Sequence, residues 1–150
     1  MIIFDGKYLN HLRTRNEVPG TYYGISGKEW TDQELFCNWL KNHFLWYVVP
    51  GRPIILLHDG HSSHYEPISI EIAQKEDVIL FCLPPHTSHE SQPLNCSVFG
   101  SLKRHWSDSC HEHQQSNSGV VINKYNFNKE NILIYFKGFD SQNIINCICG

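Results

Sequence analysis

Residues 53–85, PIILLHDGHSSHYEPISIEIAQKEDVILFCLPP, decide the fold class of this chain. The run PIILLHDG is continuously apolar until its turn residues, which is typical of a strand buried on both faces of a parallel sheet. Residues 78–85, VILFCLPP, predict a second buried strand that the prolines terminate. The intervening YEPISIEIAQKED predicts a short helix. This order forms a βαβ unit, so we expect an α/β fold in which residues 54–58 pair in parallel with residues 78–83.

The segment before this unit predicts two short strands and one helix. MIIF at residues 1–4 and GTYYGIS at residues 20–26 have the composition of short strands. Thr31 and Glu34 have the spacing of a capping box, which marks the start of a helix. An apolar stripe follows at helical spacing and ends before Pro50; its members are Leu35, Phe36, Trp39, Leu40 and Phe44. We interpret this stripe as core.

The segment after the unit predicts helices. An amphipathic helix should begin near Asn95, since apolar residues recur at Val98, Phe99, Leu102 and Trp106. SDSCHEHQQSNSG, which follows this stripe, is polar and is expected to lie beyond the helix. The tail after Val120 predicts one or two weak helices.

Composition fits one soluble globular domain and offers no general argument for nucleic acid. The chain has 150 residues, of which 41% are hydrophobic and 18% charged, and its 12 Lys and Arg against 15 Asp and Glu give a net charge of −3. The basic features are LKRHW at residues 102–106, Arg52 and Lys41, and a solvated helix face explains them better than a nucleic-acid site does.

The six cysteines and the N-terminus indicate an intracellular protein. The cysteines contain no CxxC pair and mostly lie in apolar patterns, so we expect reduced, largely buried thiols. MIIFDGKYLN has no apolar core of a signal peptide, and no apolar run reaches the length of a membrane span.

Asp59 is the first candidate site residue. It follows the strand IILLH, and in an open α/β sheet functional groups gather beyond the carboxyl ends of the strands. An Asp before Gly60 could equally be a turn residue. Asn95 opens the next helix, where a second carboxylate would complete a site for Mg²⁺ or Mn²⁺.

Histidines at both ends of the βαβ unit suggest a rival metal site. Together with Asp59, some of these histidines could form a Zn²⁺ site; the candidate ligands are His58, His61, His64, His86 and His89. DGH at residues 59–61 also echoes the Asp-x-His element of binuclear metallophosphoesterases, although the further histidine motifs of such enzymes do not occur. The alternative is that each histidine belongs to an ordinary polar network.

Several long motifs, in order, give the chain a recognisable resemblance. IIFDGK, EWTDQELFCNWLKNHF, RPIILLHDGHSSH and VILFCLPPHTSHESQPLNCSVFGSLKRHW resemble the DDE superfamily endonuclease domain of pogo, Tigger and jerky-type transposases. The resemblance covers about residues 1–125 and leaves residues 126–150 as a remnant C-terminal helical tail. It implies an RNase H-like fold, a nuclear location, DNA as partner, and three Asp residues that hold Mg²⁺ or Mn²⁺.

The resemblance also implies that this metal site is incomplete. Asp59 matches the second family Asp, and Asn95 stands where the third belongs. The first lies on a strand upstream of the IFxGK motif, within which this sequence begins, so we expect it to be missing. Asp5 lies beyond that strand and is no substitute. One anionic ligand should not hold a metal pair stably, so we expect no stable Mg²⁺ or Mn²⁺ and no catalysis.

Two functions of different classes remain open at this stage. The first is a truncated, transposase-derived RNase H-like domain that is inactive, and the second is a domesticated DNA- or protein-binding module. A His/Asp phosphoesterase is a third, weaker alternative. Without the central strand that carries the first Asp, an apolar sheet edge would be exposed, so we expect a protein partner or an oligomer to cover it.

Overall fold

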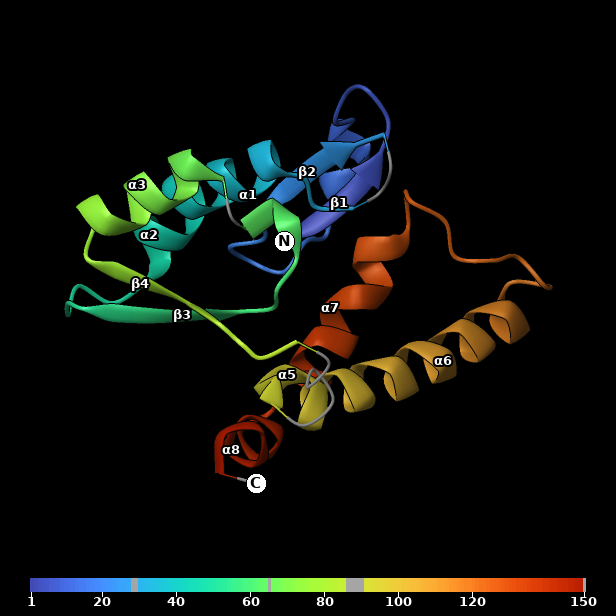
Figure 1. Cartoon of the computed structure of the whole chain (residues 1–150). Helices are drawn as coiled ribbons and strands as arrows, with labels where there is room; N and C mark the ends of the chain where they lie inside the picture. The colour runs from blue at the N-terminus through green and yellow to red at the C-terminus, as the bar shows by residue number, and fades with distance from the viewer. Residues whose placement is uncertain (28–29, 65, 86–90, 150) are drawn as a thin grey trace. The chain divides into compact units, whose positions relative to one another are not determined.

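The computed structural model describes residues 1–27, 30–64, 66–85 and 91–149. The chain divides into two compact units. The first comprises Met1–Leu9 and Tyr22–Ser88, and the second comprises Asn10–Thr21 and His89–Gly150. The first unit holds the strands and the second is helical, which confirms a mixed α/β chain (Figure 1). The boundary expected at residue 125 stays a prediction.

Two parallel strand pairs form the sheets of the first unit. β1 (Ile2–Asp5) pairs with β2 (Tyr23–Ser26), and β3 (Ile54–His58) pairs with β4 (Val78–Cys82). In the second pair Ile54 lies opposite Val78. The prediction of parallel pairing between these two runs is therefore confirmed.

A helical run before β3 and a helix after it cover one face of the β3–β4 sheet (Figure 1). The run comprises α1 (Gln33–Trp39), a π-helical turn η2 (Leu40–Phe44) and α2 (Leu45–Tyr47). α3 (Pro67–Lys75) is the crossover helix between β3 and β4, as predicted. A short 3₁₀ turn, η3 (Ser62–His64), follows the loop that leaves β3.

The helix before β3 begins one residue later than the capping box predicted. Asp32, not Thr31, is the N-cap of α1, because its carboxylate oxygen accepts a hydrogen bond from the Leu35 backbone N–H at 2.8 Å. The predicted stripe is core. Phe36 and Leu40 are buried with Ala73 of α3 and Val78 of β4.

Burial of β3 and β4 on both faces was a wrong expectation. Ile55, Leu57, Ile79 and Phe81 are 60%, 47%, 47% and 50% exposed. The register pairs Ile55 with Ile79 and Leu57 with Phe81, so these four side chains share one face of the sheet. The physical reason is that, within the first unit, the described helices pack on only one side of this two-stranded sheet. We call these four residues the apolar sheet face.

The second unit is built from helices around α6 (Val98–Ser116). Before it lies α5 (Pro93–Cys96), near the predicted start at Asn95. α7 (Phe127–Gly138) and α8 (Ser141–Cys149) confirm the helices predicted in the tail. A 3₁₀ turn, η1 (His11–Thr14), joins the unit through a hydrogen bond from Asn128 Nδ2 to the Arg13 carbonyl at 2.7 Å.

α6 extends well beyond its apolar stripe, so the expectation that the polar stretch lies outside the helix was wrong. Ser109 Oγ donates to one carboxylate oxygen of Glu130 at 3.1 Å, and His113 Nδ1 lies 3.2 Å from the other. Glu130 lies on α7. These contacts stabilise the polar half of α6 against a neighbouring helix.

Five cysteines are free thiols, as expected: Cys37, Cys82, Cys96, Cys110 and Cys147. The expectation that they are largely buried was wrong, since Cys82 and Cys96 are exposed and the other three are only partly buried. None of the helices in the described ranges is both long and apolar enough to cross a membrane.

Candidate functional site

Asp59 lies immediately after the carboxyl end of β3, where the sequence placed it. One of its carboxylate oxygens accepts a hydrogen bond from the His61 backbone N–H at 3.2 Å, so Asp59 also has the turn role that the sequence left open. Its side chain is 48% exposed, and this exposure leaves part of the carboxylate accessible from outside the fold.

Three of the five candidate histidines surround Asp59. His58 Nδ1 lies 2.6 Å from the Asp59 carbonyl oxygen, and His61 Nδ1 lies 2.8 Å from Ser63 Oγ. His64 Nδ1 lies 3.2 Å from Asp59 Oδ1 and 3.3 Å from the Asp59 carbonyl oxygen. Since carbonyl and carboxylate oxygens only accept, Nδ1 of both His58 and His64 carries the proton in this arrangement.

Packing against α1 fixes His64 in place. Its ring centroid lies 4.6 Å from that of Phe36 and 5.1 Å from that of His58. Burial is the largest influence on the His64 pKa and lowers it from the ordinary value of 6.5. The hydrogen bond to Asp59 and the charge of Asp59 act in the opposite direction. His64 is therefore a neutral donor to Asp59 at neutral pH.

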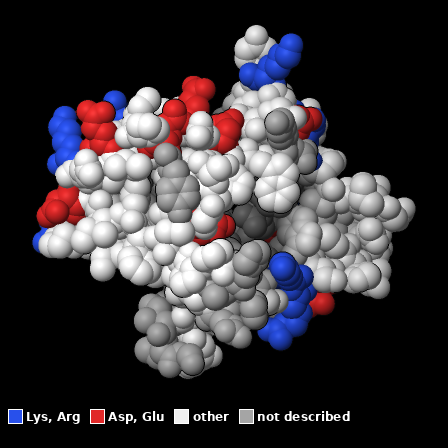
Figure 2. Space-filling model, in the orientation of Figure 1, with Lys and Arg blue, Asp and Glu red and all other residues white. Residues whose placement is uncertain are grey.

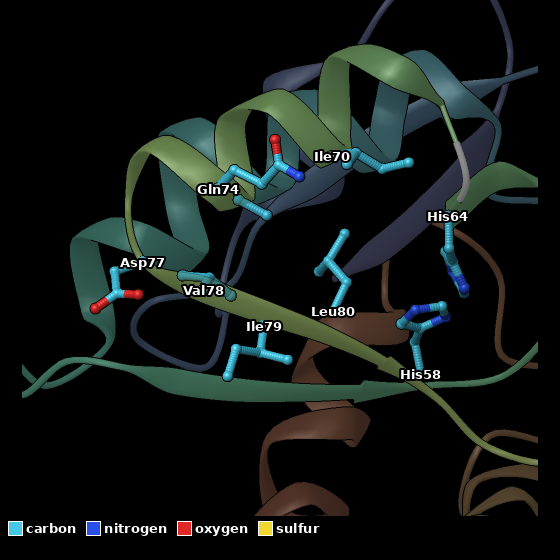
Figure 3. Close-up of a pocket in the computed structure, with 9 residues that line it drawn as sticks. His58, His64, Ile70, Gln74, Asp77, Val78, Ile79 and Leu80 are labelled. Atoms are coloured by element: carbon cyan, nitrogen blue, oxygen red, sulfur yellow. The ribbon is translucent and has the colours of Figure 1, made fainter.

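A cavity of about 480 Å³ opens beside this cluster, between α3 and β4. His58 and His64 stand at one end and Asp77 at the other, with Ile70, Val78 and Leu80 between them (Figure 3). Asp77 has φ +54°, the left-handed conformation that turns the chain from α3 into β4. The walls are largely apolar, so this cavity adds no obvious metal ligand to Asp59.

Asn95 lies in the second unit, on the short helix α5, and is exposed. Its backbone N–H donates to the Gln92 carbonyl at 2.9 Å, and its side-chain amide donates to the Gln92 side-chain oxygen. Because Asp59 belongs to the first unit, the expected proximity of Asp59 and Asn95 stays a prediction.

The donor set described here does not fit a divalent metal pair. Asp59 contributes one carboxylate, whereas a pair of Mg²⁺ or Mn²⁺ ions needs several oxygen ligands with negative charge. Within residues 1–27, 30–64, 66–85 and 91–149, no three His, Cys, Asp or Glu side chains are grouped so that they could hold a metal ion. His86 and His89 of the zinc hypothesis lie outside the described residues.

Arg52 and the basic residues of the LKRHW segment differ in their surroundings. Arg52 donates from Nε to the Glu76 carbonyl at 2.8 Å and from Nη1 to the Val49 carbonyl at 2.9 Å, so it ties the start of β3 to the end of α3. Lys103 and Arg104 are exposed on α6. On the face drawn in Figure 2, Lys and Arg occur in small separate groups.

Sequence reasoning treated His64 as a possible zinc ligand or as a member of an ordinary polar network, and it did not identify the contact with Asp59. It also gave no role to Trp30, which is 74% exposed beside the Asp59 loop. The spacing of Asp59 and His64 within one loop could have suggested their contact. The position of Trp30, an aromatic residue outside the apolar stripe, could have suggested its exposure.

The chain has a mixed α/β fold with Asp59 at the end of a strand, and comparison with known families adds the family to which it belongs. The DDE superfamily endonuclease family matches residues 1–139. This chain therefore belongs to the DDE superfamily endonuclease family, whose members generally use divalent metals.

A curated relative gives a second comparison. The chain is 31% identical over 110 residues to a protein of Cochliobolus lunatus named MFS-type transporter clz9. The match covers 71% of this chain and only 12% of that protein. No solved structure matches the chain.

Proposed function

We propose that this chain is a transposase-derived, RNase H-like domain of the pogo, Tigger and jerky type that binds DNA without cleaving it. Membership of the DDE endonuclease family supports the ancestry. The observation that carries the loss of cleavage is Asn95, which stands in the QPL motif where the resemblance calls for the third Asp. An amide oxygen can touch a metal but brings no negative charge.

The surroundings of Asp59 support the same proposal. Its carboxylate is engaged by the His61 backbone N–H and lies beside His64. A second metal ion would need further carboxylates, and the described residues contain no group of three His, Cys, Asp or Glu side chains that could hold an ion. Asp59 in this setting acts as an acceptor that orders its own loop.

The test measures nicking of a supercoiled plasmid in the presence of Mg²⁺ or Mn²⁺, together with binding of the same DNA. We expect binding without nicking in the unmodified chain and in Asp59→Ala. Asn95→Asp alone should not restore nicking, because ligands that act as a unit are not additive. Metal-dependent nicking by the unmodified chain that disappears in Asp59→Ala would overturn the proposal.

The apolar sheet face favours a second candidate function, a protein-binding module. Its four exposed apolar side chains lie side by side on two paired strands. Contiguous exposed apolar surface of this kind commonly marks an interaction site. A protein partner or a second copy of the chain would cover it, and sedimentation of the purified chain over a range of concentrations tests for the second copy.

We also propose a nuclear location, which rests on the family resemblance alone. Imaging of a tagged full-length protein would test it.

A further inference from the structure

We propose that a hollow beside the Asp59 loop is a subsite for one unpaired nucleotide, with Trp30 as the surface on which its base stacks. This inference rests on the proposed DNA binding and locates it in the first unit. The hollow has a volume of about 840 Å³. Its lining includes Ser26, Trp30, Thr31, His61, Ser62 and Ser63.

Trp30 is the feature that needs an explanation. Its side chain is 74% exposed, although Trp is a residue that folding usually buries in large part. It lies two residues before Asp32, the N-cap of α1. An exposed indole at the edge of a hollow offers a flat surface to a base, and every base can stack on it.

The same lining offers hydrogen bonds to a sugar hydroxyl or a base edge, whereas the Asp32 carboxylate, which also lines the hollow, disfavours a phosphate there. Thr31 is partly exposed and Ser62 is exposed, and within the described ranges their hydroxyls have no hydrogen-bond partner. Ser63, in contrast, is buried and its Oγ lies 2.8 Å from His61 Nδ1. A hollow lined by both an aromatic side chain and polar groups suits a nucleotide better than a wholly apolar ligand.

The hollow adjoins the family carboxylate directly. His61 lines it, and the His61 backbone N–H donates to Asp59 Oδ1 at 3.2 Å. A nucleotide held there would therefore lie next to the residue that the family resemblance assigns to metal binding. Its lining carries no Lys or Arg among the described residues, so the stacking contribution should be independent of salt.

Trp46 provides a matched control. It is 82% exposed and lines a different hollow, between the α1–α2 run and α3, with Leu45, Ile68 and Ile72. This hollow is also lined by the charged side chains of Lys41, Glu71, Lys75 and Glu76, and no residue of the Asp59 loop lines it. If the loss of any exposed indole weakened DNA binding, the Trp30 and Trp46 variants would therefore lose the same affinity.

The experiment measures binding of a short, labelled, mixed-sequence single strand by fluorescence anisotropy at low and high salt. We expect Trp30→Ala to weaken binding about 10-fold, by the same factor at both salt concentrations. Trp30→Phe should retain most of the affinity, and Trp46→Ala should retain all of it. The duplex of the same sequence should bind Trp30→Ala and the unmodified chain equally, because its base faces are stacked.

Intrinsic fluorescence gives a second readout. Addition of the strand should quench the tryptophan emission of Trp46→Ala and of the unmodified chain, and this quenching should be largely absent in Trp30→Phe. Strand binding that Trp30→Ala leaves unchanged would overturn the subsite while the proposed function stands. No binding of any DNA would overturn both. Circular dichroism of Trp30→Ala checks that the variant is folded.

Discussion

His64 Nδ1 lies 3.2 Å from Asp59 Oδ1, and the same nitrogen lies 3.3 Å from the Asp59 carbonyl oxygen. The His64 ring also packs against Phe36 of α1, at 4.6 Å between centroids. One histidine thus connects the core helix to the loop that carries the family carboxylate. The conformation of Asp59 depends on a residue five positions later in the chain and on a helix that precedes β3.

The first prediction concerns pH. Burial lowers the His64 pKa in the folded chain below its ordinary value of 6.5, so the unfolded chain binds more protons in the interval between the two values. The free energy of unfolding should therefore fall as pH decreases from about 6.5 towards the folded pKa. Urea unfolding between neutral and mildly acidic pH measures this dependence.

The matched variant is His64→Gln, which keeps a donor and cannot titrate. It should lower stability at neutral pH, because it loses the ring contact with Phe36, and it should reduce the slope with pH. A slope identical in both proteins would show that other groups cause the acid sensitivity.

The second prediction concerns thiol reactivity. Burial is the largest of the influences that raise the pKa of the Cys37 thiol, and the charge of Glu66 raises it further, while hydrogen bonds with Ser69 lower it. Because the thiolate is the reactive form, Cys37 should react with iodoacetamide more slowly than exposed Cys82 near neutral pH.

Peptide mass spectrometry over a time course separates the two sites. Glu66→Gln should accelerate alkylation of Cys37, since it removes the neighbouring negative charge, and should leave Cys82 unaffected. Equal rates at Cys37 and Cys82 would contradict the prediction.

The third prediction concerns the apolar sheet face. Ile55 is 60% exposed, so Ile55→Thr should change the free energy of unfolding by no more than about 0.5 kcal/mol and increase solubility. Val78 is 4% exposed on the partner strand, and Val78→Thr should cost about 1–3 kcal/mol because it buries a hydroxyl. Urea titration and the soluble fraction after centrifugation measure both effects. Similar losses for the two variants would show that the face is covered.

The strands and their pairing could be predicted from the sequence, because an uninterrupted apolar run that ends in turn residues is a local signal. The exposure of Ile55 could not be predicted, because the same apolar run also fits a strand that is covered on both faces. Whether one face or both faces are covered depends on the helices and strands that pack around the sheet. The length of α6 was missed for a related reason. Ser109 and His113 reach Glu130, a residue on another helix, and no local pattern contains that contact.

The candidate site was likewise predictable only in part. Asp59 was identified because its position at the end of a strand follows from the local sequence pattern. Its relationship to His64 depends on Phe36, which the sequence showed only as one member of a core stripe. The role of Trp30 depends on exposure, which no motif states.

The last prediction concerns the close approach of α6 and α7. A Cβ at Gly138 would lie 2.3 Å from Cδ2 and 2.5 Å from Cγ of Leu102, so Gly138→Ala requires the Leu102 side chain or the helix to move. We expect a loss of about 1–3 kcal/mol in the free energy of unfolding, despite the better helix propensity of Ala. Gly100→Ala on α6 is the control, because nothing lies within 4 Å of its Cβ position. It should stabilise the chain by up to about 1 kcal/mol, since only propensity changes. Thermal and urea unfolding of both variants measure the difference, and a Gly138→Ala variant as stable as Gly100→Ala would show that α6 and α7 do not pack this closely.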